Sequence, residues 1–248
     1  MARFYAPDAE QAGALAVLPD EEAEHLTRVL RLTTGAAIRV FNGRGGEFDA
    51  TIEEIARRRV QVRLDAVRDA QAEPRIAVTL AQAALKGDKM DDVVRDAVMM
   101  GVAAVQPFVA ARSDVSLATV QRGRRRERWQ RIAVSAAKQC GRATVPPVLE
   151  PRPFSEVADA LARIILPEPA LMFVEPSAAS GTLTLSDLAD AAPREATVVI
   201  GPEGGWEAAE IERGSAACRL VTLGARTLRA DAMGIVALAA LFALWKEF

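Results

Sequence analysis

VVIGPEGGW (residues 198–206) and RLVTLGARTLRADAM (residues 219–233) are the two stretches that decide the fold of this chain. Each starts with a short apolar, β-branched run and then enters a loop that contains glycine, at 201–205 and at Gly224. Glycine at this density does not suit helix or strand, so each run is predicted to be a strand that ends in a loop. Open α/β sheets bind ligands at the edge where such loops gather. The pattern therefore predicts a ligand site built from two glycine loops.

Upstream of these stretches, the hydrophobic pattern predicts strands that alternate with helices from residue 76 onward. One helix is capped by Asp88 and buries apolar residues spaced three and four apart as far as Gly101, and another carries an apolar face from Trp129 to Cys140. This alternation predicts a parallel sheet covered by helices on both faces. The predicted strands are 76–81, 102–109, 170–174, 197–200 and 219–223.

The last predicted helix, residues 231–246, is apolar around nearly its whole circumference. Such a helix must be buried on more than one side. A subunit interface would bury it in this way, and so would a position in the centre of a core. Both interpretations stay open at this point.

Residues 1–70 have a different pattern, which predicts a compact β-barrel. Short alternating strands at 36–41, 48–52 and 60–64 are joined by turns, and a small helix after Pro19 carries Ala23, Leu26, Val29 and Leu30. RNA-binding barrels are of this size class. The polar segment DAQAEP (69–74) is the best linker, so we expect two domains, 1–70 and 74–248.

Composition excludes several classes of protein. The chain has 248 residues, 50% of them hydrophobic, and a formal net charge of −2, which is typical of a globular protein. Its longest apolar run, 233–245, is shorter than the roughly 20 residues that span a bilayer, and we expect a cytoplasmic protein. Two distant cysteines and one histidine predict neither a metal site nor a disulfide framework.

The two glycine stretches together resemble a signature of the SPOUT-class RNA methyltransferases. Within that class they resemble the family that methylates N3 of a uridine in 16S ribosomal RNA, the ribosomal RNA small subunit methyltransferase E family. Four further segments resemble signatures of the family in the right order, so the resemblance covers nearly the full length. They are HLTRVLR (25–31), KGDKM (86–90), MGVAAVQP (100–107) and RWQRIAVSAAKQCGRATVPP (128–147).

The resemblance implies a C-terminal α/β domain with a trefoil knot that holds S-adenosylmethionine, an N-terminal PUA-like β-barrel, a homodimer, and U1498 of the 30S subunit as the target. None of this follows from periodicity, and knots are rare in proteins. By itself, GPEGG would more often be a purely structural turn. Neither the dinucleotide fingerprint nor the P-loop spacing is present. The implied cofactor contacts are Glu175, Pro176, Gly201, Pro202, Glu203, Gly204, Gly205, Leu223, Gly224, Leu228 and Arg229.

Methylation of uridine N3 requires the loss of a proton that lies between two carbonyl groups. We expect Arg229 to stabilise the resulting anion and Glu203 or Asp231 to accept the proton. The segment Ala230-Asp231-Ala232-Met233 departs from the family, in which a Thr-Glu-Thr-Ala-like segment is expected. Lys138 and Met99-Met100 depart from it as well. The alternatives are an RNA-binding protein without turnover and a SPOUT enzyme that acts on another RNA.

RNA binding must rely on local positive patches, because the net charge is slightly negative. Arginines gather at 57–59 and again at 122–131. Such runs are either solvated surfaces or phosphate contacts, and their density in an acidic chain favours phosphate contacts. The predicted RNA contacts are Arg31, Arg57, Arg58, Arg59, Lys86, Arg112, Arg124, Arg125, Arg126 and Arg142.

Overall fold

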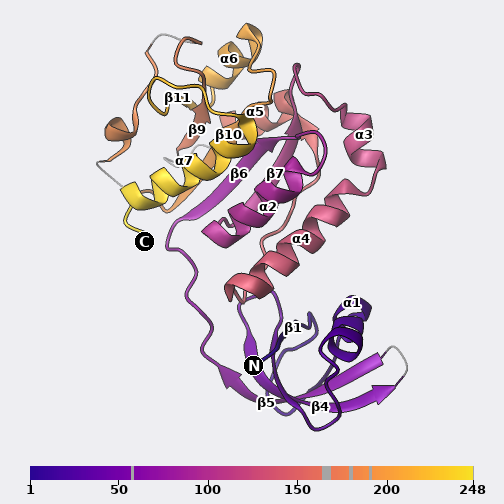
Figure 1. Cartoon of the computed structure of the whole chain (residues 1–248). Helices are drawn as coiled ribbons and strands as arrows, with labels where there is room; N and C mark the ends of the chain where they lie inside the picture. The colour runs from indigo at the N-terminus through magenta and orange to yellow at the C-terminus, as the bar shows by residue number, and fades with distance from the viewer. Residues whose placement is uncertain (57–58, 164–168, 179–180, 190–191, 248) are drawn as a thin grey trace. The chain divides into compact units, whose positions relative to one another are not determined.

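The computed structural model describes residues 1–56, 59–163, 169–178, 181–189 and 192–247 (Figure 1). They form two compact units. The first combines Met1–Glu73 with Val134–Val145, and the second combines Pro74–Ala133 with Pro146–Phe248. The predicted RNA contacts Arg57 and Arg58 lie outside the described residues.

The first unit is built on a five-stranded sheet in the order β1-β3-β4-β5-β2. β1 is parallel to β3, and the other pairs are antiparallel. Register shifts at Asp49/Ala50 and Ile52/Glu54 interrupt the β4–β5 ladder, and such bulges bend a sheet. Alternate residues of the long strands fill one core, as their period-2 pattern predicted. The strands are β1 (Arg3–Tyr5), β2 (Leu15–Val17), β3 (Ala37–Phe41), β4 (Glu47–Ala56) and β5 (Arg59–Arg68).

The small helix of this unit differs from the prediction in its second half. Helix α1 (Asp20–Glu24) continues as a π-helix, η1 (His25–Val29). Only Ala23 and Leu26 of the predicted apolar face are buried, whereas the side chains of Val29 and Leu30 are exposed. A π-turn holds more residues than an α-turn, so the residues after it no longer follow the i, i+3, i+4 spacing.

Residues 134–145 complete the first unit, although the sequence places them in the C-terminal domain. They comprise the end of helix α4 (Arg125–Cys140) and the loop that follows it. The Arg3 guanidinium donates to four carbonyl oxygens there, those of Ala137, Lys138, Gly141 and Arg142, at 2.8–3.3 Å. Ala137 and Lys138 lie in the last turn of α4, where carbonyls begin to lack intrahelical partners, and Gly141 and Arg142 lie in the loop that follows.

The second unit contains a six-stranded sheet in the order β11-β9-β10-β6-β7-β8, and every pair is parallel. The predicted parallel α/β sheet is therefore confirmed. The ends of the five predicted strands differ from the prediction by at most two residues, and one further short strand, at 152–153, was not predicted. The strands are β6 (Ala77–Ala83), β7 (Ala104–Val109), β8 (Arg152–Pro153), β9 (Ala170–Phe173), β10 (Glu195–Ile200) and β11 (Arg219–Val221).

Helices cover both faces of this sheet. On one face, α7 (Ala230–Leu244) packs on β10 and beside α2 (Lys89–Met100). On the other, Ala81, Met172 and Val199 pack with α5 (Phe154–Ala162) and with Trp206, and α5 contacts α6 (Ala208–Ser215). Neighbouring residues of one strand face opposite layers, so Leu80, Gln82 and Ile200 face α7. The remaining helices are α3 (Leu117–Arg122) and the 3₁₀ turn η2 (Leu185–Leu188).

Helix α2 buries the predicted face, but Asp88 does not cap it. Met90, Val93, Val94, Ala97 and Val98 are all buried. Asp88 occupies the N-cap position, and its side chain makes no capping hydrogen bond. Its carboxylate instead pairs with Arg128 at 2.9 Å.

The described residues contain neither a helix long and apolar enough to cross a membrane nor a cluster of three side chains suited to a metal ion. Cys218 is buried, and this burial raises the pKa of its thiol to about 12. Cys140 is only partly buried. Both thiols are free.

Candidate functional site

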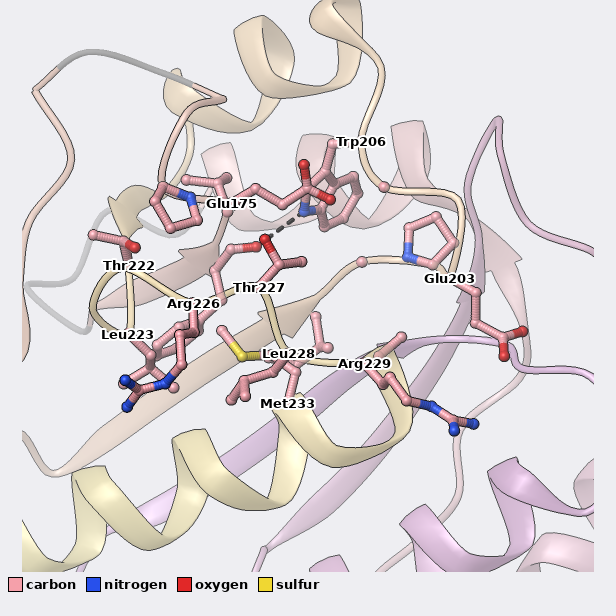
Figure 2. A pocket seen from close by; sticks show the side chains of 18 of the residues that line it. Glu175, Glu203, Trp206, Thr222, Leu223, Arg226, Thr227, Leu228, Arg229 and Met233 are labelled. Atoms are coloured by element: carbon pink, nitrogen blue, oxygen red, sulfur yellow. Dashed lines mark hydrogen bonds between the residues drawn. The ribbon is translucent and has the colours of Figure 1, made fainter.

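A pocket opens where β9, β10 and β11 end, at the edge of the sheet that the sequence predicted (Figure 2). It brings together both glycine loops, the segment after β9 and the start of α7. Nine of the eleven predicted cofactor contacts line it, and Gly204 and Gly224 do not. The lining residues are Lys89, Phe173–Pro176 (173–176), Ile200–Glu203 (200–203), Gly205, Trp206, Thr222, Leu223, 226–230 and Met233.

The first loop is held by Trp206. Its indole Nε1 donates to the carbonyl oxygen of Phe173 at 2.9 Å (Figure 2). Its ring stacks on Phe108 and packs against Phe154. A Cβ on Gly201 would lie 2.6 Å from the indole. The loop after β10 is therefore anchored to the end of β9, and this close packing requires glycine at position 201.

Packing within the chain also requires glycine at positions 204 and 205. A Cβ on Gly204 would lie 2.8 Å from the carbonyl oxygen of Arg112. One on Gly205, which has φ 73°, would lie 2.9 Å from Oε1 of Glu175. Gly204 therefore packs against the backbone at Arg112 and does not line the pocket, so its role as a cofactor contact stays a prediction.

The second loop, between β11 and α7, leaves its backbone open. Gly224 has φ 73°, and a Cβ there would meet no atom within 4 Å. Thr222 is tied down by two hydrogen bonds, from its N–H to Leu183 and from its hydroxyl to Gly224. Leu223, Leu228 and Met233 give this side of the pocket an apolar lining.

Charged side chains mark the two ends of the pocket. Figure 2 shows Glu203 and Arg229 at one end and Arg226 at the other. Glu203 forms an ion pair with Lys89, and Arg229 pairs with Asp231 at 3.2 Å. Arg229 is the N-cap residue of α7, and 73% of its side chain is exposed. The three predicted catalytic residues therefore belong to two cation–carboxylate pairs.

Of the segments that depart from the family pattern, Ala230 and Met233 line the pocket, and Asp231 holds Arg229. Lys138 belongs to the first unit, where its ammonium contacts Glu22 at 2.7 Å and His25 Nδ1 at 3.2 Å. The departure at 230–233 thus changes the pocket itself. The departure at Lys138 supports packing within the first unit.

Several predicted RNA contacts are engaged within the protein. Arg142 is buried and pairs with Glu73 at 2.9 Å, so its prediction as a surface contact is wrong. Arg126 donates to the carbonyl oxygen of Val148 and pairs with Glu150.

Other predicted RNA contacts are held only loosely. A long ion pair of 3.8 Å joins Arg112 to Glu207, and another joins Arg124 to Glu127. Arg125 is partly buried, and the exposed members of the set are Arg31, Arg59, Lys86, Arg112, Arg124 and Arg126.

Sequence reasoning missed Lys89 as a pocket residue. Its only signal is its place in KGDKM, where Lys86 was chosen as an RNA contact. Arg128, a member of the arginine run at 122–131, pairs with Asp88 and Asp91 of the protein itself. The charge of Asp91, and then that of Asp88, raises the pKa of Arg128 above its usual value.

Two family models match this chain, and together they include residues of both units. Residues 72–242 match the family described as RNA methyltransferase domain, and residues 18–65 match the RNA methyltransferase PUA domain. Several curated relatives carry the name ribosomal RNA small subunit methyltransferase E. The one from Synechocystis is 33% identical over 93% of this chain and 74% of its own length. The one from Bacillus subtilis is 30% identical over 89% of this chain and 87% of its own.

Solved structures of methyltransferases share the fold of this chain. A methyltransferase from Legionella pneumophila, solved with bound SAM, matches with a TM-score of 0.86 and 30% identity over 97% of this chain and 96% of that one. The ribosomal RNA small subunit methyltransferase E of Neisseria gonorrhoeae, bound to S-adenosylmethionine, matches with a TM-score of 0.85 and 32% identity over 99% of this chain and 98% of that one. The chain therefore belongs to the RNA methyltransferase family that includes ribosomal RNA small subunit methyltransferase E.

Proposed function

We propose that this protein uses S-adenosylmethionine to methylate N3 of a uridine in the 16S rRNA of the small ribosomal subunit. The observation that carries this proposal is the convergence of both glycine loops and the start of α7 on one pocket. Relatives that cover nearly the whole chain carry a name for methylation of small-subunit ribosomal RNA, and one of them was solved with S-adenosylmethionine.

The pocket suits S-adenosylmethionine in shape and chemistry. The apolar side chains of Leu223, Leu228 and Met233, next to the open backbone at Gly224, would hold a flat, weakly polar group such as adenine. The polar groups of Glu175 and Thr222 would bind hydroxyl and amino groups. When bound, the cofactor supplies a methyl group activated by a positive sulfonium, and N3 attacks its carbon as the carbon–sulfur bond breaks.

We propose Arg229 as the residue that stabilises the N3 anion and Glu203 or Asp231 as the proton acceptor. Arg229 lies at the rim of the pocket, with 73% of its side chain exposed, so its guanidinium has freedom to turn toward a nucleotide. Once it contacts the carbonyl oxygens of the base, a cationic donor stabilises the negative charge that grows on them in the transition state.

The finer parts of the proposal concern the target and the assembly. We propose U1498 within the 30S subunit as the target, the cytoplasm as the place of action, and a homodimer as the working form. The family resemblance implies the target and the dimer. An apolar stripe on α7 that the monomer leaves exposed supports the dimer. The C-terminal trefoil knot remains a prediction.

The test is methylation of 30S subunits prepared from a strain that lacks this activity. We expect the purified protein to add one methyl group per subunit, which mass mapping should assign to one uridine of the 16S rRNA and fragmentation to its base. A methyl group on the ribose would contradict the proposal, and so would one on another RNA. Binding of S-adenosylmethionine without any methyl transfer would instead favour an RNA-binding protein without turnover.

A further inference from the structure

Lys89 is the member of the pocket that comes from a different part of the chain. Among the described residues, every other lining residue lies between Phe173 and Met233, whereas Lys89 is the first residue of α2. Its ammonium forms an ion pair with the Glu203 carboxylate, and the two side chains are 36% and 25% exposed. The pair therefore lies at the boundary between the pocket and solvent, where an entering ligand can reach it.

The turn that carries Lys89 is held in place from its other side. Arg128 of α4 pairs with Asp88 and with Asp91, which lie on either side of Lys89 in the sequence. Arg128 thus pairs with both of the carboxylates nearest to Lys89 along the chain. Lys89 pairs instead with Glu203, 114 residues further along the chain.

The charges around Lys89 match the chemistry of the proposed substrate. Loss of the N3 proton places negative charge on the two carbonyl oxygens that flank N3 of uracil. The pocket has two cation–carboxylate pairs, Lys89 with Glu203 and Arg229 with Asp231. Figure 2 shows Glu203 and Arg229 at the same end of the pocket, away from Arg226. Two cations are thus available at one end for two oxygens.

We propose that Lys89 contacts the substrate, and this inference rests on the proposed function. When the target uridine enters, the Lys89 ammonium exchanges Glu203 for a carbonyl oxygen of uracil. The released Glu203 carboxylate then accepts the N3 proton, the N3 electron pair forms the new bond to the methyl carbon, and the electrons of the broken bond remain on sulfur. One positive and one negative charge disappear together, because the sulfonium becomes a thioether and the carboxylate becomes a carboxylic acid.

The experiment compares Lys89→Met and Lys89→Arg with the parent protein in single-turnover methylation of 30S subunits. Lys89→Met should lower the saturated rate constant by about 10²- to 10³-fold, the scale for one preorganised donor. Its affinity for S-adenosylmethionine and for 30S subunits should stay within about threefold of the parent, because the contact forms fully only as charge develops. Lys89→Arg should recover part of the rate. Lys246→Met removes an exposed lysine far along the chain and should behave like the parent.

A double variant separates substrate contact from mere support of Glu203. If Lys89 acts on uracil itself, Lys89→Met with Glu203→Gln should be slower than either single variant. A double variant only as slow as Glu203→Gln would overturn the contact and leave Lys89 as a positioning residue.

Three other results would also overturn the inference. They are an unchanged rate in Lys89→Met, a loss confined to S-adenosylmethionine affinity, and weaker 30S binding with a shallower salt dependence at an unchanged saturated rate. The last of these would identify a phosphate contact. An inactive parent protein that still binds the cofactor would overturn the proposed function and this inference together, whereas an active parent with an equally active Lys89→Met would overturn this inference alone.

Discussion

Glycine has two distinct roles in the loops of this pocket. Gly201, Gly204 and Gly205 are crowded by Trp206, Arg112 and Glu175 of the same chain. At Gly224 the constraint is the positive φ alone, since the space beside it is open. The glycines of the first loop are therefore required by packing, whereas Gly224 is required only by its backbone conformation.

The two roles predict different results for Gly204→Val and Gly224→Val. Gly204→Val should lower the melting temperature, because its side chain would displace the backbone at Arg112. Gly224→Val should abolish binding of S-adenosylmethionine in calorimetry, because its side chain would fill the open space beside the pocket. Gly35→Val is the control for backbone strain, since Gly35 has φ 86° and equally open surroundings in the first unit. Normal cofactor binding by a folded Gly224→Val would contradict the assignment.

Arg229 and Arg226 lie at opposite ends of the pocket, so we expect their replacement by alanine to have different effects on methylation. Arg229→Ala should lower the saturated rate constant of 30S methylation by about 10²- to 10³-fold, with little change in cofactor affinity. Arg226→Ala, at the opposite end of the pocket, should leave the saturated rate constant closer to that of the parent. A collapse of cofactor affinity in Arg229→Ala at a preserved saturated rate would make Arg229 a brace of the loop.

At the scale of elements, α7 joins the core to the pocket. Its first turn carries Asp231, and its buried face includes Gly234, Leu238 and Phe242. Gly234 lets the helix approach the sheet, because a Cβ there would lie 2.9 Å from Oε1 of Gln82. Burial against the sheet therefore accounts for part of the apolar surface of α7. The remainder is an exposed stripe that contains Ala232, Val236 and Ala243.

The exposed stripe on α7 predicts that Val236→Glu separates a dimer without unfolding the subunits. Val236 is 43% exposed in the single chain, so a charge there should cost little in a monomer and much in an interface. Light scattering should find the parent dimeric at micromolar concentration and the variant monomeric, with unchanged circular dichroism. A monomeric parent protein would rule out the interface. Val67→Glu, which makes the same substitution at an exposed valine of β5 in the first unit, is a matched surface control.

At the scale of the whole molecule, the first unit is assembled from two separate pieces of the chain. Val134–Val145 returns to it from the middle of the sequence. Arg3 fixes this second segment to the first. Its guanidinium pairs with Glu47 at 3.2 Å and donates to carbonyl oxygens at the end of α4 and in the loop after it. The side chains of Arg3 and Glu47 are only 12% and 8% exposed.

Arg3→Ala is therefore predicted to lower the free energy of unfolding by about 3–5 kcal/mol, the usual effect of removing one partner of a buried ion pair. The loss arises because the Glu47 carboxylate and several carbonyls remain buried without their donor. Urea denaturation should show a lower midpoint. Arg44→Ala breaks an exposed pair with Glu10 and should cost at most about 1 kcal/mol. Equal losses in the two variants would show that the buried network adds no stability.

The sequence by itself determined the features that depend on near neighbours in the chain. Alternation and i, i+3, i+4 spacing identified the strands and the buried face of α2, because these periods follow from local backbone geometry. Glycine density located both loops, and parallel strands brought their ends to one edge. The path of the chain after His25 was missed, because no side-chain pattern separates a π-turn from an α-turn there.

Only the tertiary structure decided which charges meet. Arg142 pairs with Glu73 across 69 residues of sequence, and Lys89 pairs with Glu203 across 114. A run of arginines therefore looks the same in sequence whether its members face RNA or a carboxylate of the protein. The same holds for Gly204, whose neighbour is the backbone at Arg112. Such partners are set by packing between distant segments, and local periodicity carries no information about them.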